Sequence, residues 1–477
     1  MSGPLPPPPH SESPRHAAVP LPPPPGTPPG APPPGGRAPT GGLAPPGVGG
    51  PFAQPAGTTH PAQPTSPGER EPILDLLRGV ALLGILLVNI ELMRGPDLYT
   101  LLAGQTPPEG STADGIASFA VGWLASGKFI SSFSILFGIG AALIVTRAEQ
   151  RGHEPRGLLA RRYGVLMAFG LAHMVLLFPG DILFVYGVTG MILLGFVGVR
   201  PRTALWWSAG LLGGIALLTT AFVGIGLLIG DIEVGDDDPF VAAVEDFADT
   251  RRAQAVEAFT DGHYGQIVVA NLWQAAFVQA GQLFAIPWIL GLFLFGFAVG
   301  RSGMIADLAG HRRRLRGAAA IGLGLGLPLN LVLGMVGPLA TGGALGAGDV
   351  DGVLAAATVA ELVGAPLLAV GYLAAIALLA LRVGVPGPLA AVGRMALSAY
   401  LLQSVLALVV FAGFGLYDQL TPASGLLVVA GIWAVLLIAC PLWLRAFRFG
   451  PVEWLWRSLS YARRQPMRRS EPDRPST

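Results

Sequence analysis

Runs of about 20 apolar residues recur along most of this chain, and they restrict its fold more than any other feature. A helix of about that length spans the hydrocarbon core of a bilayer, because each residue adds about 1.5 Å. The mean hydropathy is +0.58, and charged residues make up 12% of the chain, about half the share in soluble domains. The alternating strands of a membrane barrel are not visible. The sequence therefore predicts an all-α polytopic membrane protein.

Ten apolar segments can be distinguished, and the basic residues indicate their orientation. The segments are residues 73–94, 128–147, 159–178, 181–199, 203–229, 283–300, 316–337, 356–381, 392–412 and 423–445. Lys and Arg are concentrated in the cytoplasmic loops of membrane proteins. With both termini inside, all but four of the 30 basic residues fall on the cytoplasmic side, the exceptions being Arg94, Lys128, Arg251 and Arg252. We therefore expect about ten transmembrane helices in an N-in, C-in arrangement.

Three regions differ from the apolar segments of the predicted membrane domain, which covers 71–447. Residues 1–70 contain 24 of the 44 prolines, a composition typical of a disordered cytoplasmic tail or of a docking segment for a proline-recognising partner. Residues 231–282, within the domain, form an acidic outer loop. Residues 448–477 are expected to form a cytoplasmic interfacial helix and a basic tail, which would bind anionic headgroups or attract a phosphate-bearing substrate.

Two outer segments have the pattern of interfacial helices. One is 112–127, and the other begins near Gly265 within the acidic loop. On the second, Asn271, Gln274 and Gln282 fall within one stripe. These helices either roof a cavity that opens to the outside or only lie on the membrane surface.

The first apolar segment carries three polar residues on nearly one line. A helix turns about 100° per residue, so Arg78 and Asn89, eleven positions apart, share a face, and Asp75 lies one turn from Arg78. Polar groups at such depth usually face protein or water. The pattern indicates either a functional site or three separate structural roles. In the second case Asp75 caps the helix, Arg78 anchors it at the headgroups, and Asn89 forms a hydrogen bond with a neighbouring helix.

Two further groups of polar residues lie near the predicted outer surface. His173 and Asp181 flank a tight Pro-Gly turn, and Tyr186 follows on the next helix. The pair would serve as a base and the group that orients it, or Asp181 would only cap its helix. No nearby Ser or Cys is a clear nucleophile, so a catalytic triad is not predicted. Lys128 would either snorkel to the headgroups or hold an anionic group.

The ninth segment carries another polar stripe. Arg394 is expected to reach Ser398 one turn on, and Tyr400 to face Gln403 and Ser404. Polar packing between helices is the alternative interpretation. The single cysteine and the lack of a Walker loop or an HExxH motif give no indication of a metal site, a cofactor or nucleic-acid binding.

These stretches, in this order, resemble the family called domain of unknown function 418, the YeiB-like bacterial membrane proteins. The matching stretches are Leu74-Asp75-Leu76-Leu77-Arg78-Gly79 continuing to Val88-Asn89, Lys128-Phe129 with Phe133-Ser134-Ile135-Leu136-Phe137-Gly138, Gly180-Asp181-Ile182-Leu183 with Tyr186, Gly393-Arg394-Met395-Ala396 with Tyr400 and Gln403-Ser404, and Gly450-Pro451-Val452-Glu453-Trp454-Leu455-Trp456-Arg457. The resemblance covers about residues 70–469 and implies a bacterial plasma-membrane location.

The family is in turn similar to transmembrane acyltransferases of the heparan glucosaminide acetyltransferase type. Those enzymes transfer an acyl group from cytoplasmic acyl-CoA to a sugar on the far side of the membrane. They share an Asp-x-x-Arg-Gly pattern followed by Val-Asn, which here falls on Asp75, Arg78 and Asn89. The acetyltransferase carries a functional His shortly after that Asn, whereas residues 90–100 contain none. Either His173 takes that role from another helix, or the chemistry differs.

The leading hypothesis is therefore an acyltransferase that acts on an envelope glycan or lipid, with acyl-CoA as co-substrate and no other cofactor. Arg78 and neighbouring cytoplasmic arginines would hold the phosphates, Asn89 would polarise the thioester carbonyl, and His173 or Asp181 would deprotonate the acceptor hydroxyl. The other candidate substrate-binding residues are Asp75, Lys128, Tyr186, Arg394, Tyr400 and Gln403. A transporter or flippase for an envelope precursor is the second hypothesis, and a non-enzymatic membrane scaffold is the third. The sequence gives no oligomeric state.

Overall fold

Nearly all the residues that the structure describes lie in helices. The computed structural model describes residues 71–103, 110–229, 239–341 and 356–469, with Gly3 and Val353. These residues form helices and no β-strand, and one isolated antiparallel bridge joins Phe447 to Arg468. The all-α prediction is thus confirmed. The proline-rich tail, the first part of the acidic loop and the last residues of the basic tail lie outside the described residues.

The elements follow one another with short connections. In chain order they are α1 (Pro72–Arg94), α2 (Asp97–Leu102), α3 (Thr112–Leu124), α4 (Lys128–Gln150), α5 (Arg156–Leu176), α6 (Leu183–Leu193), the 3₁₀ helix η2 (Leu194–Phe196), α7 (Pro201–Ile229), α8 (Pro239–Thr260), α9 (Tyr264–Phe284), α10 (Ile286–Arg301), the 3₁₀ helix η3 (Met304–Asp307), α11 (Arg312–Thr341), the π-helix η4 (Ala360–Gly364), α13 (Ala365–Val383), α14 (Gly387–Arg394), α15 (Ala396–Leu408), the π-helix η5 (Val409–Gly413), α16 (Pro422–Ala446) and α17 (Pro451–Ser460).

Each of the ten predicted segments coincides with a helix. Among the described residues, eight helices are long and apolar enough to cross a membrane, and seven of them overlap predicted crossings. The eighth is α9, which the sequence placed at the interface. Its amide side chains Asn271 and Gln274 are buried on one face, so the helix packs into the bundle instead of presenting them to headgroups. A break at Ala285 and Pro287 then separates α9 from α10.

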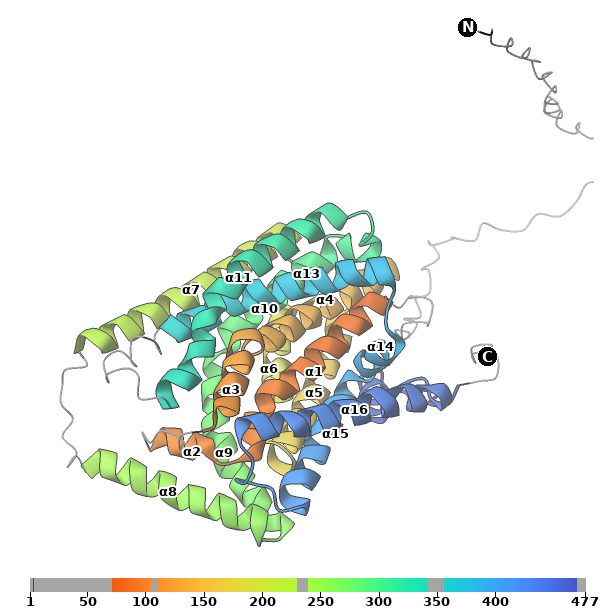
Figure 1. Cartoon of the computed structure of the whole chain (residues 1–477). Coiled ribbons are helices and arrows are strands. Elements are labelled where there is room, and N and C mark those ends of the chain that lie inside the picture. Colours follow the sequence, from red (N-terminus) through yellow and green to blue (C-terminus); the bar gives the residue numbers. More distant parts are fainter. Residues whose placement is uncertain are drawn as a thin grey trace, which may run out of the picture. The chain divides into compact units, whose positions relative to one another are not determined.

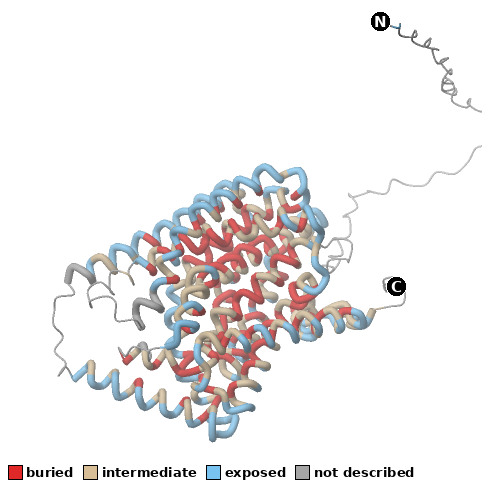
Figure 2. Tube along the Cα trace, in the orientation of Figure 1, coloured by how far each residue is buried: buried red, intermediate tan, exposed pale blue. Residues whose placement is uncertain are grey.

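The central helices are buried, and the peripheral ones present apolar side chains outward. Figure 1 shows α4, α6 and α10 within the bundle, with α7 and α11 along one side. In Figure 2 the buried residues concentrate on these central helices, and α7 is mostly exposed. On α7 the exposed side chains include Trp206 and Phe222. A hydrophobic surface of this kind is expected where a helix faces lipid.

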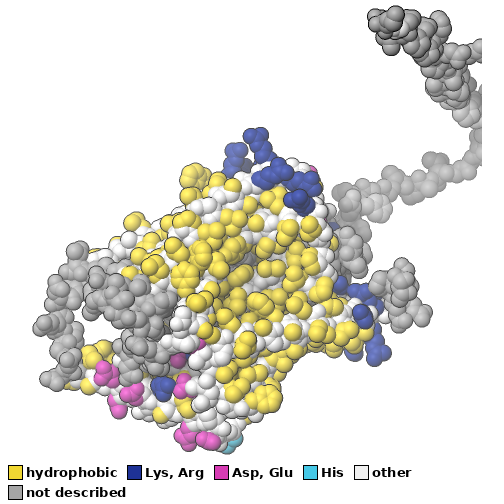
Figure 3. Space-filling view, viewed as in Figure 1, with side chains coloured by type: hydrophobic (Ala, Val, Ile, Leu, Met, Phe, Trp, Pro, Cys, Tyr) yellow, Lys and Arg dark blue, Asp and Glu magenta, His cyan; other side chains and the backbone are white. Residues whose placement is uncertain are grey.

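Charged side chains gather at opposite ends of the bundle. Figure 3 shows Lys and Arg at one end, Asp and Glu mainly at the other, and a hydrophobic band between them. We call the end with Arg312 and Arg457 the arginine end, and the end near α8 the acidic end. The separation of charge agrees with the distribution of basic residues along the sequence.

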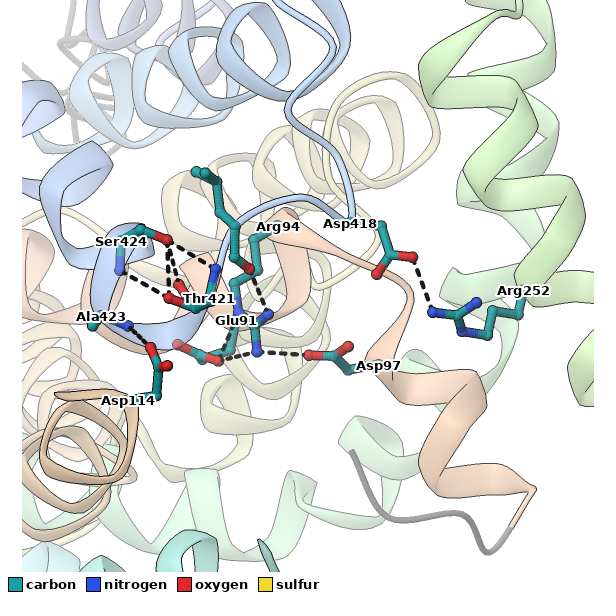
Figure 4. A network of polar contacts seen from close by, with 10 residues as sticks. Glu91, Arg94, Asp97, Asp114, Arg252, Asp418, Thr421, Ala423 and Ser424 are labelled. Carbon is teal, nitrogen blue, oxygen red and sulfur yellow. Dashed lines mark hydrogen bonds and ion pairs between the residues drawn. The ribbon is translucent and has the colours of Figure 1, made fainter. Parts of the chain in front are cut away.

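A polar network joins several helices at the acidic end (Figure 4). The Arg94 guanidinium pairs with Asp97 at 2.7 Å and donates to the Leu420 carbonyl at 3.0 Å. The Asp418 amide donates to the Arg94 carbonyl at 2.8 Å, and the Asp418 carboxylate pairs with Arg252 of α8 at 2.9 Å. Arg94 and Arg252, two of the four basic residues that lie away from the arginine end, are thus neutralised by carboxylates. The network fixes α8 to the ends of α1 and α16.

We expect Arg252→Ala to loosen α8. The Arg252–Asp418 pair is partly exposed, so its loss should cost about 1 kcal/mol and raise hydrogen exchange in residues 239–260 about fivefold. Hydrogen-exchange mass spectrometry would measure this change. Arg313→Ala, an exposed substitution on α11, serves as the control. Unchanged exchange in α8 would show that the ion pair does not hold this helix.

Candidate functional site

A cavity of about 280 Å³ opens at the arginine end, between α1, α4, α5, α6, α14, α15 and α17. Five of its lining residues are arginines: Arg78, Arg147, Arg162, Arg394 and Arg457. Tyr186 and Tyr400 also line it. Of the residues predicted to bind substrate, Asp75, Arg78, Tyr186, Arg394 and Tyr400 all lie on its wall.

The arginines are held by aromatic rings as well as by acids. The Arg162 guanidinium lies 4.0 Å from the centre of the Trp456 ring, and that of Arg457 lies 4.6 Å from the centre of the Phe449 ring. Arg78 pairs with Asp75 at 3.0 Å. Burial, together with the nearby charges of Arg162 and Arg78, lowers the pKa of Arg457 to about 10. The cavity lining has five arginines against three acids, Glu71, Asp75 and Glu453, and this excess of basic residues favours an anionic ligand.

The deeper part of the cavity is apolar. Its lining residues there include Leu82, Ile85, Leu136, Phe137, Leu166 and Leu183. The Tyr163 hydroxyl also lines the cavity, is buried, and has no hydrogen-bond partner among the described residues. An unpaired buried hydroxyl is costly unless a ligand or water satisfies it. The cavity thus fits an amphiphile with an anionic head and an apolar chain.

Two glycines place the arginines of α1 and α14 at the mouth. A Cβ atom on Gly393 would lie 1.7 Å from the Asp75 carbonyl oxygen, and one on Gly79 would lie 2.2 Å from the Leu389 carbonyl oxygen. The two backbones therefore touch at this crossing, which only glycine permits. Arg78 and Arg394 are the chain neighbours of these glycines, so the crossing sets both on the cavity wall.

Glu453 of α17 closes the arginine end of α15. Its carboxylate accepts hydrogen bonds from the Leu397 amide at 2.6 Å, the Ser398 amide at 2.9 Å and the Ser398 hydroxyl. The contact expected between Arg394 and Ser398 stays a prediction; α17 folds back against α15 and places Glu453 on Ser398. Burial raises the pKa of Glu453 above its usual value, and the bonds from Ser398 and Leu397 oppose that rise.

This raised pKa predicts a pH-dependent contribution to stability. Between the unfolded and folded pKa values the folded state binds more protons, so its stability falls as the pH rises through that window. We expect wild-type protein to lose thermal stability relative to Glu453→Gln as the pH is raised from about 4.5 toward neutrality. Melting temperatures of the two proteins across that range would measure the difference. A difference that does not change with pH would contradict the prediction.

The most ordered polar constellation lies just beyond the inner end of the cavity. The His173 Nδ1 atom is 2.8 Å from Asp181 Oδ1, and its Nε2 atom is 2.9 Å from Ser404 Oγ. The His173 and Asp181 side chains are fully buried. Since an ionised Asp181 can only accept, Nδ1 donates to it and Nε2 is left to accept the Ser404 proton. The expectation that no serine is available was wrong: α15 brings Ser404 to His173 from 231 positions away.

Neighbouring groups hold this constellation in place. The second Asp181 oxygen accepts from the Phe184 amide at 2.8 Å, and Gln279 of α9 donates to the Asp181 backbone carbonyl at 2.8 Å. The Tyr400 ring centre lies 5.0 Å from that of His173. Tyr400 also lines the arginine-end cavity, so it contacts both that cavity and His173.

A second, smaller cavity reaches Ser404 from the acidic end. It has a volume of about 20 Å³ and is lined by Ser404 of α15, Asn271 and Gln274 of α9, and Phe259 of α8. Asn271 and Gln274 are buried, and their amide nitrogens have no hydrogen-bond partner within the described ranges. Two members of the predicted stripe on α9, Asn271 and Gln274, thus face a cavity at this end of the molecule, whereas Gln282 does not line it.

Three predicted site residues lie elsewhere. Asn89 is half-buried and lines neither cavity. Lys128 is completely buried and donates to the Gly122 carbonyl at 2.8 Å, so it does not snorkel. Gln403 is buried and donates to the Leu82 carbonyl at 3.4 Å. In the described part of the chain, no group of three or more His, Cys, Asp or Glu side chains is arranged to hold a metal ion.

Several residues of the site could not be identified from the sequence as members of it. Arg162 and Arg457 were covered only by the general expectation for the cytoplasmic arginines near Arg78. The contact of Arg162 with Trp456 follows from the packing of α17 against α5, and Arg457 contacts Phe449 just before α17. Asn271 and Gln274 gave a detectable signal, since amides on one face of an apolar helix imply a polar partner or a cavity.

Comparison with known proteins places the chain in a family. A family model described as "Protein of unknown function (DUF418)" matches residues 299–463. The uncharacterized protein YxaH of Bacillus subtilis (strain 168) is 31% identical over 426 residues, which cover 85% of this chain and 98% of the relative. The uncharacterized protein YeiB of Escherichia coli (strain K12) is 28% identical over 402 residues, covering 82% of this chain and 96% of the relative. No solved structure matches the chain. The protein is therefore a member of the DUF418 family, of the YeiB-like kind.

Proposed function

We propose that this protein is a membrane-bound acyltransferase, which moves an acyl group from a cytoplasmic acyl thioester such as acyl-CoA to a hydroxyl acceptor on the other side of the bacterial plasma membrane. One observation carries the proposal: the buried His173, paired with Asp181, contacts Tyr400 on the wall of the arginine-end cavity and Ser404 on the wall of the smaller cavity. A base in that position serves a reaction whose two substrates arrive from opposite sides.

The arginine end suits the donor. The positive-inside rule assigns this end to the cytoplasm, where acyl-CoA is found. Arginines form bidentate hydrogen bonds with phosphates, and five of them line the mouth. The apolar wall beyond them accommodates an acyl chain, and its inner end at Tyr400 brings the thioester close to His173.

The His173–Asp181 pair would supply the proton transfer. With Asp181 holding Nδ1, Nε2 takes a proton from the attacking hydroxyl and returns it to the leaving thiolate. General base catalysis of this kind typically contributes about 10²–10⁴-fold. The proposal gives Asn89 no role in the transfer, because it lies outside both cavities.

A transporter or flippase for an anionic amphiphile is the second candidate. The two cavities on opposite sides of the Tyr400 ring are the observation that favours it, since alternating access needs a site reachable from both ends. The two candidates share the ligand class of the arginine-end cavity and differ in whether the thioester bond is broken.

Binding of acyl-CoA thioesters to purified, detergent-solubilised protein tests the donor site. We expect saturable binding, weakened at least about tenfold by Arg78→Gln with Arg457→Gln, because two phosphate contacts are lost. Arg313→Gln, which leaves the cavity unchanged, should bind like the wild type. Isothermal titration with acetyl- to palmitoyl-CoA would measure this. A folded sample without saturable binding would refute the proposal, and binding without thiol release in the presence of a membrane extract would favour the transporter.

A further inference from the structure

We propose that Ser404 is the nucleophile of this reaction and carries the acyl group as an ester between two half-reactions. The inference rests on the proposed function and goes beyond it, since a single direct transfer would need only His173 as base. The juxtaposition of Ser404 with His173 and with two unpaired amides is the observation that carries it.

The hydrogen bond of Ser404 is unusual for a serine within a helix. A hydroxyl inside a helix ordinarily donates to the carbonyl one turn before it, here that of Tyr400. Ser404 instead meets the Nε2 atom of His173 at 2.9 Å, across the contact between α15 and α5. With Nδ1 held by Asp181 at 2.8 Å, the chain Ser–His–Asp has the connectivity that activates a hydroxyl for attack. Fully buried His173 and Asp181 side chains keep water away from that chain.

The small cavity supplies groups to stabilise the negative charge that forms on attack. Asn271 and Gln274 line it together with Ser404, and their amide nitrogens are buried donors without an acceptor in the described part of the chain. Unpaired buried donors are costly, so a pair of them beside Ser404 calls for an acceptor that enters the cavity. A volume of about 20 Å³ admits one oxygen-sized group. The two amides are therefore the donors for the tetrahedral oxyanion.

The two half-reactions balance with His173 as the only proton carrier. First, Ser404 Oγ bonds to the thioester carbonyl carbon and gives its proton to Nε2; the carbon–sulfur bond breaks, and the thiolate takes that proton. Second, the acceptor hydroxyl bonds to the same carbon and gives its proton to Nε2; the bond to Oγ breaks, and Ser404 regains a proton. Ser404 lies one turn beyond Tyr400 on α15, so the Tyr400 ring must turn aside for the first step.

Covalent labelling tests the inference. Full-length protein in detergent would be incubated with isotopically labelled acyl-CoA without acceptor and examined by intact-mass and peptide mass spectrometry. We expect one acyl group on Ser404 of the wild type, none on Ser404→Ala or His173→Gln, and an undiminished label on Ser132→Ala, a buried serine of α4 outside both cavities. Ser404→Cys should be labelled as a thioester, which neutral hydroxylamine cleaves although it leaves the serine ester intact.

Different experimental outcomes would refute the role of Ser404 and the proposed acyltransferase function. Wild-type protein that binds acyl-CoA and releases thiol in the presence of acceptor, yet never carries an acyl group, would overturn the role of Ser404 and leave direct transfer standing. Ser404→Ala that transfers at the wild-type rate would do the same. Protein that does not bind acyl-CoA at all would refute both.

Discussion

His173→Gln is expected to lower the rate of acyl transfer by about 10³-fold or more while donor binding stays within a few-fold of the wild type. His173 contacts both Asp181 and Ser404, at 2.8 and 2.9 Å, so its loss removes the base without touching the arginines at the cavity mouth. Thiol release from acyl-CoA by proteoliposomes supplied with a membrane extract would measure the rate.

Asp181→Asn distinguishes catalysis from packing at the same site. The amide oxygen can still accept from Nδ1, but the amide nitrogen can also donate to it, which favours the tautomer with Nε2 protonated and unable to take the Ser404 proton. We expect a loss comparable to that of His173→Gln, in a protein that melts within a few degrees of the wild type.

His311→Gln provides the control for these substitutions, because His311 precedes α11 at the arginine end and lines neither cavity. Folded His173→Gln protein that turns over acyl-CoA at the wild-type rate would show that the buried pair only stabilises the contact between α5 and α6.

The sequence predicted well those features that depend on residues close together in the chain. The helices follow from apolar runs, and the His173–Asp181 pair follows from a tight turn that separates its members by eight positions. Gly170 completes this pairing, since a Cβ there would lie 2.2 Å from the Phe184 amide nitrogen. Without that close approach of α5 to α6, the carboxylate would not reach the ring.

Features that depend on which helices pack together could not be predicted. Ser404 was expected to face Tyr400, and only the packing of α15 on α5 shows that it meets His173. Asn89, in contrast, was expected in the site and does not line the cavity. The stripe of α1 that lines the cavity runs through Arg78, Leu82 and Ile85 and would continue to Asn89, as the helical periodicity predicts. The lining of the cavity nevertheless ends at Ile85 on α1, and Asn89 is not part of it.

Gly393→Ala is expected to produce the largest loss of stability of any conservative change in the membrane domain. Its Cβ would lie 1.7 Å from the Asp75 carbonyl oxygen and 2.7 Å from the Gly79 amide nitrogen, so α1 and α14 must separate. Both contacts are with backbone, which side-chain rotation cannot relieve, and overpacking of this kind costs about 3 kcal/mol or more. Gly387→Ala, on the same helix with open space around it, should leave stability nearly unchanged.

Melting curves followed by size-exclusion chromatography would measure both variants, and a Gly393→Ala protein as stable as Gly387→Ala would show that this crossing tolerates a methyl group.

The Gly393→Ala substitution also tests how fold and site are linked. Arg78 and Arg394 are adjacent in sequence to the two glycines of the crossing, so a separation of α1 from α14 moves both guanidinium groups away from the cavity mouth. Whatever Gly393→Ala protein folds should therefore bind acyl-CoA more weakly, although no cavity-lining charge has been removed. His173→Gln should show the opposite combination, with donor binding kept and turnover lost, because the crossing that positions the donor and the base that acts on it lie at opposite ends of the same cavity.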